Sequence, residues 1–315
     1  MDTKTIPYYS FGDFLKKRFP FKVQKISVNA GFTCPNRDGT KGVGGCTYCN
    51  NDTFHPAYCG TEKSISTQLE EGIRFFARKY PEMKYLAYFQ AYTNSYASLE
   101  TLRQKYEEAL AFPGVTGLII GTRPDCMPDV LLDYLAGKAA QAFILVEYGV
   151  ESASDGTLQR INRGHTWQES VDTIRRTHAK GIAAGAHLLL GLPGEEREQM
   201  LHLADLVSAL PLTVVKLHQL QIIRHTALEK EFREHPGHFR LFSPEEYVDF
   251  VIDFLERLPP EMAVDRFVSQ SPKELLIAPD WGLKNHEFTA LVHKRFAARR
   301  TRQGARYQPS LICKS

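Results

Sequence analysis

The feature that most constrains the fold of this chain is a regular alternation of short apolar runs with longer amphipathic segments. Apolar runs are typical of parallel strands buried on both faces, and apolar residues every three or four positions are typical of helices. The predicted strands are residues 25–28, 85–90, 115–121, 143–150, 184–191 and 214–223, and the predicted helices are residues 64–80, 99–112, 128–140, 166–180, 195–210 and 243–258. Six such units predict an α/β fold, a partial (β/α)6 TIM-like barrel, with its functional residues at the carboxyl ends of the strands.

Two extensions flank this predicted barrel, which we place at residues 25–258. Residues 1–24 form an N-terminal extension in which Phe11, Phe14, Leu15 and Phe19 follow helical spacing. Residues 259–315 form a C-terminal α+β extension, with one more strand near 263–268, a helix near 287–298 and a basic tail.

The charge of the chain is unevenly distributed. The formal net charge is +3, from 39 Lys and Arg against 36 Asp and Glu. Seven of the basic residues follow Glu287 and no acidic residue does, which leaves 32 basic and 36 acidic residues before that point. A basic tail on a slightly acidic body predicts an anionic partner such as RNA. The tail residues that carry this prediction are Lys294, Arg295, Arg299, Arg300, Arg302 and Arg306.

The sequence shows no sign of membrane insertion or export. No apolar run reaches the roughly 18 residues of a membrane span, and the N-terminal residues MDTKTIPYYS lack the apolar centre of a signal peptide. We therefore expect a cytoplasmic protein without membrane contact, in which thiols stay reduced. This expectation argues against disulfides among the six cysteines and favours metal binding or catalysis where cysteines cluster.

Three cysteines do cluster, as Cys34, Cys46 and Cys49, with eleven residues between the first two and two between the last two. Glycines in the intervening loop allow three thiolates to converge on one metal centre. Two centres fit this pattern: a structural zinc ion, with His55 as the fourth ligand, or an iron–sulfur cluster with one iron left open. The other three cysteines, Cys59, Cys126 and Cys313, are isolated in the sequence and are predicted to be small buried side chains. For Cys126, contact with the active site is an alternative.

The stretch Cys34-Pro-Asn-Arg-Asp-Gly-Thr, followed by Gly-Gly-Cys46-Thr-Tyr-Cys49, resembles the cysteine loop of the radical S-adenosylmethionine (SAM) enzymes. The resemblance covers about residues 20–290. It is closest to a small, largely uncharacterised group whose cysteine loop is similar to that of the elongator catalytic subunit. Most of the superfamily has three residues between the first two cysteines, so the eleven residues found here mark the subgroup.

This resemblance implies that the three clustered cysteines hold a [4Fe–4S] cluster and that residues at the strand ends bind SAM. Glu151 follows Glu147-Tyr-Gly-Val, which is similar to a family motif, and Arg163 matches an arginine that pairs with the SAM carboxylate. Glu147 itself is predicted to be a buried acid paired with a neighbour. The complete set of implied SAM-binding residues is Tyr48, Thr93, Asn94, Glu151, Arg163, His187 and Gly191.

The function implied by the resemblance is reductive cleavage of SAM to a 5′-deoxyadenosyl radical, which abstracts hydrogen from a substrate that the sequence does not identify. A one-electron reductant such as flavodoxin or ferredoxin is then an expected partner. Together with the basic tail, the resemblance favours modification of RNA, and of tRNA in particular. Two alternatives stay open: a radical SAM enzyme that acts on a small metabolite, and a zinc-stabilised RNA-binding protein without enzymatic activity.

Overall fold

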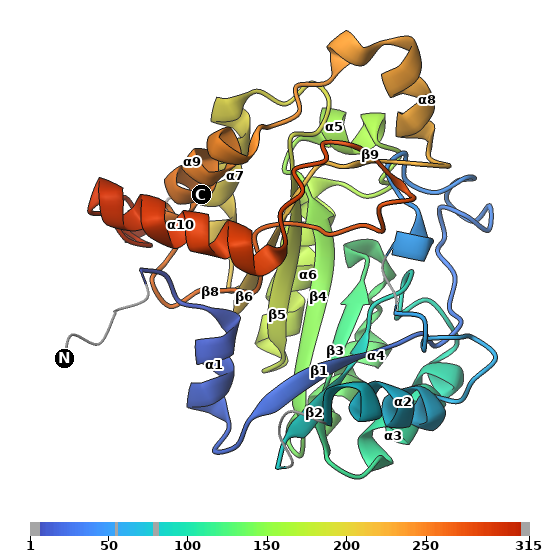
Figure 1. Ribbon diagram of the computed structural model, residues 1–315. Helices are drawn as coiled ribbons and strands as arrows, with labels where there is room; N and C mark the ends of the chain where they lie inside the picture. The colour runs from blue at the N-terminus through green and yellow to red at the C-terminus, as the bar shows by residue number, and fades with distance from the viewer. Residues whose placement is uncertain (1–6, 54–55, 78–81, 310–315) are drawn as a thin grey trace.

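The computed structural model of the chain describes residues 7–53, 56–77 and 82–309. Its centre is a parallel sheet with the strand order β1-β2-β3-β4-β5-β6-β8 (Figure 1). The strands are β1 (Val23–Val28), β2 (Lys84–Phe89), β3 (Val115–Thr122), β4 (Phe143–Glu151), β5 (Ala183–Leu190), β6 (Val214–Gln219) and β8 (Ala263–Val264). Each strand pairs in parallel with the next in this order. The predicted α/β fold and partial TIM-like barrel are therefore confirmed.

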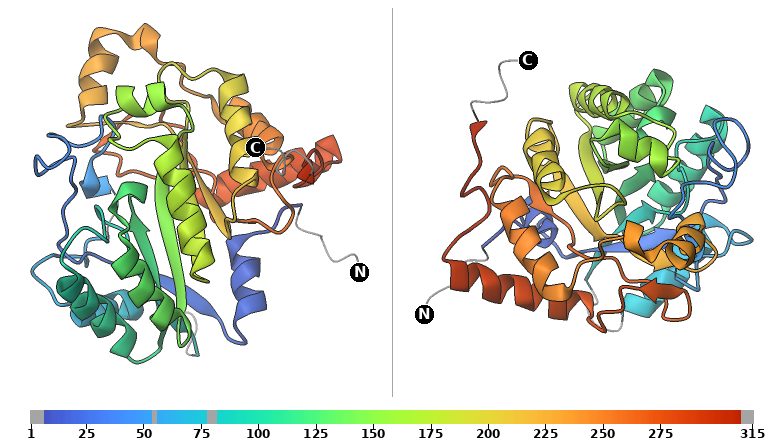
Figure 2. Two further views of the ribbon diagram at one scale, coloured as in Figure 1. Left: turned by 180° about the vertical axis from the view of Figure 1, so that it is seen from behind. Right: turned by 90° about the horizontal axis from the view of Figure 1, so that it is seen from above.

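The six predicted crossover helices cover the outer face of the curved sheet, as Figure 2 shows from above. They are α2 (Ile65–Ala77), α3 (Leu99–Ala111), α4 (Asp129–Ala139), α6 (Trp167–Ala179), α7 (Arg197–Ser208) and α9 (Pro244–Leu255). Side-chain caps fix where several of them begin. Ser243, for example, accepts from Glu246 N while the Glu246 carboxylate accepts from Ser243 N, and Pro244 occupies the first turn.

The two edges of the sheet approach each other across its concave side. Lys25 on the edge strand β1 places its Nζ 2.6 Å from Oδ2 of Asp265, which directly follows the opposite edge strand β8. The short helix α1 (Phe11–Arg18) lies at the amino end of the strands, where the preceding residue Ser10 forms an isolated parallel bridge with Val264 of β8. The sheet is thus curled into a half-barrel with a lumen.

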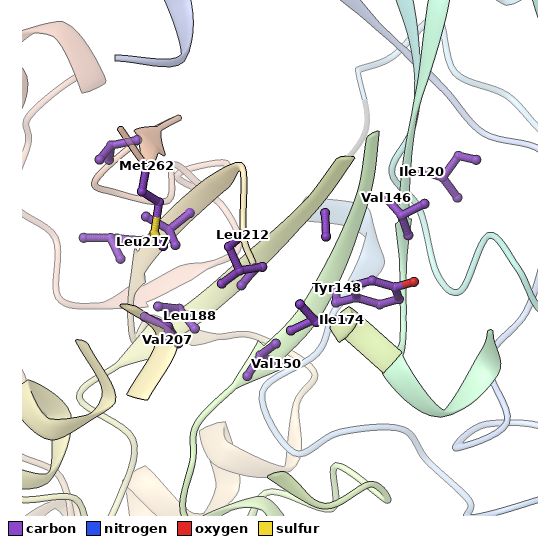
Figure 3. Packing of buried hydrophobic residues seen from close by; sticks show 14 of the residues in the cluster. Ile120, Val146, Tyr148, Val150, Ile174, Leu188, Val207, Leu212, Leu217 and Met262 are labelled. Atoms are coloured by element: carbon purple, nitrogen blue, oxygen red, sulfur yellow. The ribbon is translucent and has the colours of Figure 1, made fainter. Parts of the chain in front are cut away.

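The side chains of strand β4 alternate between the helix-covered face of the sheet and the lumen. Val146, Tyr148 and Val150 point toward the helices, where they pack beside Ile174 of α6 (Figure 3). The Tyr148 hydroxyl also forms a 2.6 Å hydrogen bond with Thr177. Because successive side chains alternate in a strand, the residues between them face the lumen.

The lumen side is layered along the strands. At the amino end, Phe143 and Leu145 of β4 belong to an apolar cluster with Phe11 and Leu15 of α1. Glu147 comes next on the same face, and Gly149 and Glu151 follow at the carboxyl end. The half-barrel therefore has an apolar base, a charged middle and an open carboxyl end.

Four elements differ from the sequence prediction. The run predicted as one strand over 214–223 ends at Gln219. After it, β7 (Ile222–Ile223) pairs antiparallel with β9 (Leu276–Ala278). Helices α5 (Asp155–Arg160) and α8 (Ala227–Glu234) were not predicted. These short elements gather at one end of the half-barrel in Figure 1.

The C-terminal helix α10 (Asn285–Arg299) packs on α9. The expectation that the basic C-terminal residues lack acidic partners is wrong, because several of them form ion pairs. Arg299 Nη1 lies 2.6 Å from Asp253 Oδ1 on α9, and Arg295 and Arg299 both pair with Asp249. Arg306 Nε lies 2.8 Å from Glu256 Oε2. The acidic partners are distant in sequence and were invisible to a local count of charges.

The predicted boundaries at residues 24 and 258 stay predictions, although β8 of the C-terminal extension joins the main sheet. Within the described ranges, the helices are all too short or too polar to cross a bilayer.

Candidate active site

One cavity of about 180 Å³ opens at the carboxyl end of the strands. Its lining comes from both edges of the sheet: the cysteine loop that follows β1, and residues 266–271 that follow β8. The ends of β3, β4, β5 and β6 supply the wall between them. The cavity therefore lies at the carboxyl ends of the strands, where functional residues are predicted in a barrel of this type.

Cys34, Cys46 and Cys49 all line this cavity. The loop that carries them folds back because Gly45, at φ 84°, donates its N–H to Asn36 O over 2.8 Å. Only glycine adopts this backbone conformation without strain. The structure thus places the three predicted metal ligands around one cavity.

Polar N–H groups contact the sulfurs of two of these cysteines. Asn36 Nδ2 lies 3.6 Å and Arg163 Nη1 lies 3.5 Å from Cys46 Sγ. Asn51 Nδ2 lies 3.4 Å from Cys49 Sγ. Donors and positive charge beside a sulfur stabilise the thiolate form, which is the form that binds metal.

Burial opposes this effect at Cys49 and favours the neutral thiol. Burial raises the pKa of its thiol to about 11, the neighbouring Cys46 acts in the same direction, and Arg37 opposes both. Arg37 also donates from Nη2 to Cys49 O over 2.9 Å. Metal binding must therefore displace a proton from this thiol, which makes binding weaker at lower pH.

Arg163 and Glu151 meet next to the cysteines. Arg163 Nη2 donates to Gly149 O over 2.6 Å and lies 3.7 Å from Glu151 Oε1. Burial raises the pKa of Glu151, while Arg163 and a hydrogen bond from Tyr48 oppose the rise. These three predicted SAM-binding residues line the same cavity as the cysteines, so the structure brings them together.

The backbone is strained at several points around the cavity. Tyr92, Glu151 and Asn162 have φ values of 61°, 67° and 52°, in the left-handed region that side chains other than glycine rarely adopt. The pairing of β4 with β5 also shifts register between Gly149 and Glu151. Each such residue costs about 1–3 kcal/mol, and strain of this kind gathers at functional sites.

The remaining predicted SAM-binding residues divide into two groups. Thr93 and His187 line the cavity, whereas Asn94 and Gly191 do not. The Asn94 side chain donates to Phe89 O and Gly121 O and so holds the chain between β2 and β3. Gly191 lies at the end of β5, where an added Cβ would be 3.3 Å from the Phe242 ring.

His187 belongs to a buried network of charges in the middle of the lumen. Its Nε2 lies 2.7 Å from Glu147 Oε2, which also accepts from Lys216 Nζ over 2.7 Å. Lys216 Nζ lies 3.1 Å from Asp265, the partner of Lys25. Burial and Lys216 lower the pKa of His187 to about 4. Glu147 is therefore the paired buried acid that the sequence indicated.

The other cysteines lie outside the cavity or outside the described residues. Cys59 and Cys126 are buried and do not line it, while Cys313 lies outside the described ranges. His55, the proposed fourth zinc ligand, is also outside the described residues. Across the described ranges, no group of three His, Cys, Asp or Glu side chains is arranged to hold a metal ion.

Sequence reasoning missed several residues of the site. Asn36 and Arg37 lie two and three positions after Cys34, so their proximity to the first cysteine was a usable signal. Arg266 also lines the cavity, but it follows a strand of two residues and carried no signal in the sequence.

Comparison with known proteins now identifies the family. The chain matches the Radical SAM superfamily over residues 32–207 and the Radical_SAM C-terminal domain over residues 212–298. The chain belongs to the radical SAM superfamily.

Two bacterial proteins are similar to this radical SAM protein over most of their length. Uncharacterized protein YtqA of Bacillus subtilis (strain 168) is 35% identical over 301 residues, which are 96% of this chain and 93% of YtqA. Protein YhcC of Escherichia coli (strain K12) is 36% identical over 272 residues, 86% of each chain.

A solved structure shares the fold. The archaeal Methanocaldococcus infernus Elp3 with an N-terminal deletion (1–46) superimposes with a TM-score of 0.69 at 17% identity, over 90% of this chain and 64% of that chain. This match confirms the half-barrel architecture. The predicted likeness to the elongator catalytic subunit is supported by sequence: Elongator complex protein 3 of Mus musculus is 29% identical over 177 residues, which are 55% of this chain and 31% of that protein.

Members of this superfamily normally bind a [4Fe–4S] cluster and SAM. The residues of the cavity fit that pair. Three thiols from one loop line it, N–H donors contact the sulfurs of Cys46 and Cys49, and the buried Arg163 and Glu151 lie beside them.

Proposed function

We propose that this radical SAM protein holds a [4Fe–4S] cluster with Cys34, Cys46 and Cys49 and binds SAM next to it. The observation that carries the proposal is that the three cysteines share one cavity with Arg163 and Glu151. When bound, such a cluster supplies the electron that cleaves SAM to methionine and a 5′-deoxyadenosyl radical.

The chain's own residues would position SAM and protect the reaction. Arg163 carries the positive charge suited to the SAM carboxylate, and Glu151 and Thr93 offer oxygen acceptors for its ammonium and ribose hydroxyl groups. Tyr48 and His187 complete the wall of the same cavity. Its base is closed by the charged network and by the apolar cluster on α1, which excludes solvent from below.

The test is anaerobic purification followed by measurement of iron, acid-labile sulfide and 5′-deoxyadenosine after addition of SAM and dithionite. Wild-type protein is expected to carry about four irons and to cleave SAM. Cys46→Ala should lose both properties. Cys59→Ala is the matched control, because it removes a buried thiol outside the cavity and should retain both.

A colourless protein that keeps one zinc ion after anaerobic reconstitution with iron and sulfide would overturn the proposal. It would instead favour a zinc-stabilised binding protein.

We further propose that the substrate is RNA, with tRNA as the preferred class, and that the protein works in the cytoplasm with a flavodoxin- or ferredoxin-type electron donor. The likeness to an Elp3 fold and the basic C-terminal residues support this proposal. The ion pairs to α9 reduce the free charge, so the exposed Lys294, Arg300 and Arg302 carry most of the expected RNA contact.

A further inference from the structure

The cavity has a second polar wall that SAM binding, as proposed above, does not use. It consists of His218 at the end of β6 and of Arg266 and Ser269, which follow β8. The strand order places this wall after one edge of the sheet and the cysteine loop after the other. We call these three residues the Arg266 wall.

Hydrogen bonds fix the protonation of His218. Arg266 Nη2 lies 3.2 Å and Ser269 Oγ lies 2.6 Å from its Nδ1. The guanidinium only donates, so Nδ1 accepts and the ring proton resides on Nε2. Burial and Arg266 hold the pKa of His218 well below its usual value, so the ring is neutral at physiological pH.

Two donors of this wall have no partner among the described residues. They are His218 Nε2, on a side chain that is nine-tenths buried, and Arg266 Nε. A buried donor without an acceptor costs about 1–3 kcal/mol. The wall therefore offers N–H groups from two side chains to an acceptor that enters the cavity.

The charge balance of the lumen points the same way. Lys25 and Lys216 are matched by Asp265 and Glu147, with which they form ion pairs. Arg266 forms no ion pair with any carboxylate of the described ranges, and within those ranges its guanidinium hydrogen-bonds to a neutral imidazole. A partly buried guanidinium without a counter-charge favours an anion.

We propose that the Arg266 wall is an oxyanion-binding subsite that holds a carboxylate or phosphate group of the substrate. The opposite wall, with the cysteines and Arg163, is left for the cofactors. Assignment of the oxyanion to the substrate rests on the proposed function, whereas the existence of the subsite does not.

The probe for the subsite is inorganic phosphate, added to the full chain at constant ionic strength, with its affinity read from the rise in unfolding temperature. Wild-type protein should be stabilised by phosphate, and Arg266→Gln should bind it roughly tenfold more weakly or worse. Arg175→Gln on α6 is the control, because it removes an equal charge from an exposed position and should bind as wild type does.

Arg266→Lys keeps the charge and guards against a variant that does not fold. Its phosphate affinity should lie between those of wild type and Arg266→Gln, because the charge remains while the planar fork is lost. Equal phosphate affinity in wild type, Arg266→Gln and Arg266→Lys would overturn the proposal. An equal loss in Arg266→Gln and Arg175→Gln would do the same.

Equilibrium dialysis with labelled SAM then separates the two possible sources of the oxyanion. Unchanged SAM affinity in Arg266→Gln assigns the subsite to the substrate. A parallel loss of SAM and phosphate affinity would assign it to the SAM carboxylate and overturn the proposal. Neither measurement needs SAM cleavage, so failure of the radical chemistry would be seen separately, as absent 5′-deoxyadenosine.

Discussion

Single residues at the carboxyl end of β4 decide how the site is assembled. Gly149 faces the lumen, and an added Cβ would lie 2.4 Å from Arg163 Nη2 and 2.7 Å from Glu151 Oε1. The absence of a side chain allows the guanidinium to reach both Gly149 O and the sulfur of Cys46. This glycine is thus required by close approach of another side chain, even though its own φ is not in the left-handed region.

Gly149→Ala should therefore displace Arg163 and weaken SAM binding by about tenfold or more, which corresponds to roughly 1.4 kcal/mol. Gly137→Ala is the matched control, since nothing lies within 4 Å of its added Cβ. That change within α4 should stabilise the fold by up to about 1 kcal/mol and leave SAM affinity unchanged. Equilibrium dialysis with labelled SAM and urea unfolding measure the two effects, and equal SAM affinities in both variants would contradict this role of Gly149.

The protein should lose stability in mild acid because several of its histidines are buried in the neutral form. The pKa of His187 is about 4 in the folded protein, against 6.5 for an ordinary histidine. Between these values the unfolded chain binds a proton that the folded chain does not, so stability falls as pH falls. The loss reaches about 1.4 kcal/mol per pH unit for such a group. The lowered pKa values of His165, about 3, and of His218 act in the same direction.

Urea unfolding between pH 7 and pH 5 measures this dependence. His187→Gln removes one of the three groups and should lose less stability over that interval than wild type does. The same pH dependence in both proteins would show that His187 is not held neutral by the fold.

At the scale of elements, α10 is held mainly by its apolar face. Phe288, Val292 and Phe296 recur at intervals of four residues and are all buried. The ion pairs of Arg295 and Arg299 with α9 are partly exposed, and pairs of that kind contribute about 0–1 kcal/mol each. Truncating the chain inside α10 would therefore disturb packing as well as charge.

Phe296→Ala should lower the free energy of unfolding by about 3–5 kcal/mol, because it opens a cavity between α10 and α9. Leu291→Ala on the same helix is the control. The Leu291 side chain is 38% exposed, so Leu291→Ala should lower the free energy of unfolding by well under half as much as Phe296→Ala does. Urea unfolding compares the two variants, and similar losses would mean that α10 does not depend on this face.

At the scale of the whole molecule, the curl of the sheet creates the cavity. Residues separated by 240 positions, Lys25 and Asp265, form an ion pair across the lumen. This closure brings the cysteine loop and residues 266–271 to opposite sides of one space. Both cofactor and substrate chemistry are therefore expected within the same half-barrel.

The proposed RNA contact is a property of the molecular surface and is tested by charge. Changing Lys294, Arg300 and Arg302 together to Gln should weaken tRNA binding and reduce its salt dependence, because fewer phosphate contacts release counterions. Filter binding over a range of salt concentrations measures both effects. Replacing exposed basic residues Lys16, Lys17 and Arg18 on α1 is a control of equal charge. An equal effect of the two triple variants would remove the tail from the RNA proposal.

The sequence by itself determined the alternation of strands and helices, because this alternation depends on local periodicity. The cysteine loop and the segments that contain Glu151 and Arg163 were predicted from their resemblance to family motifs. Parallel strands bring their carboxyl ends together whatever the details of packing. Glu147 was recognisable as a paired acid because an isolated carboxylate is rarely buried in a strand.

Only the tertiary structure decided which distant residues meet. Arg266 hydrogen-bonds to His218, and Asp249 forms an ion pair with Arg295. The Asn94 side chain donates to the backbone oxygen of Gly121. Such contacts depend on how far the sheet curls and on which helix packs beside which. No pattern within a few residues of a side chain carries that information, because the partners come from opposite edges of the fold.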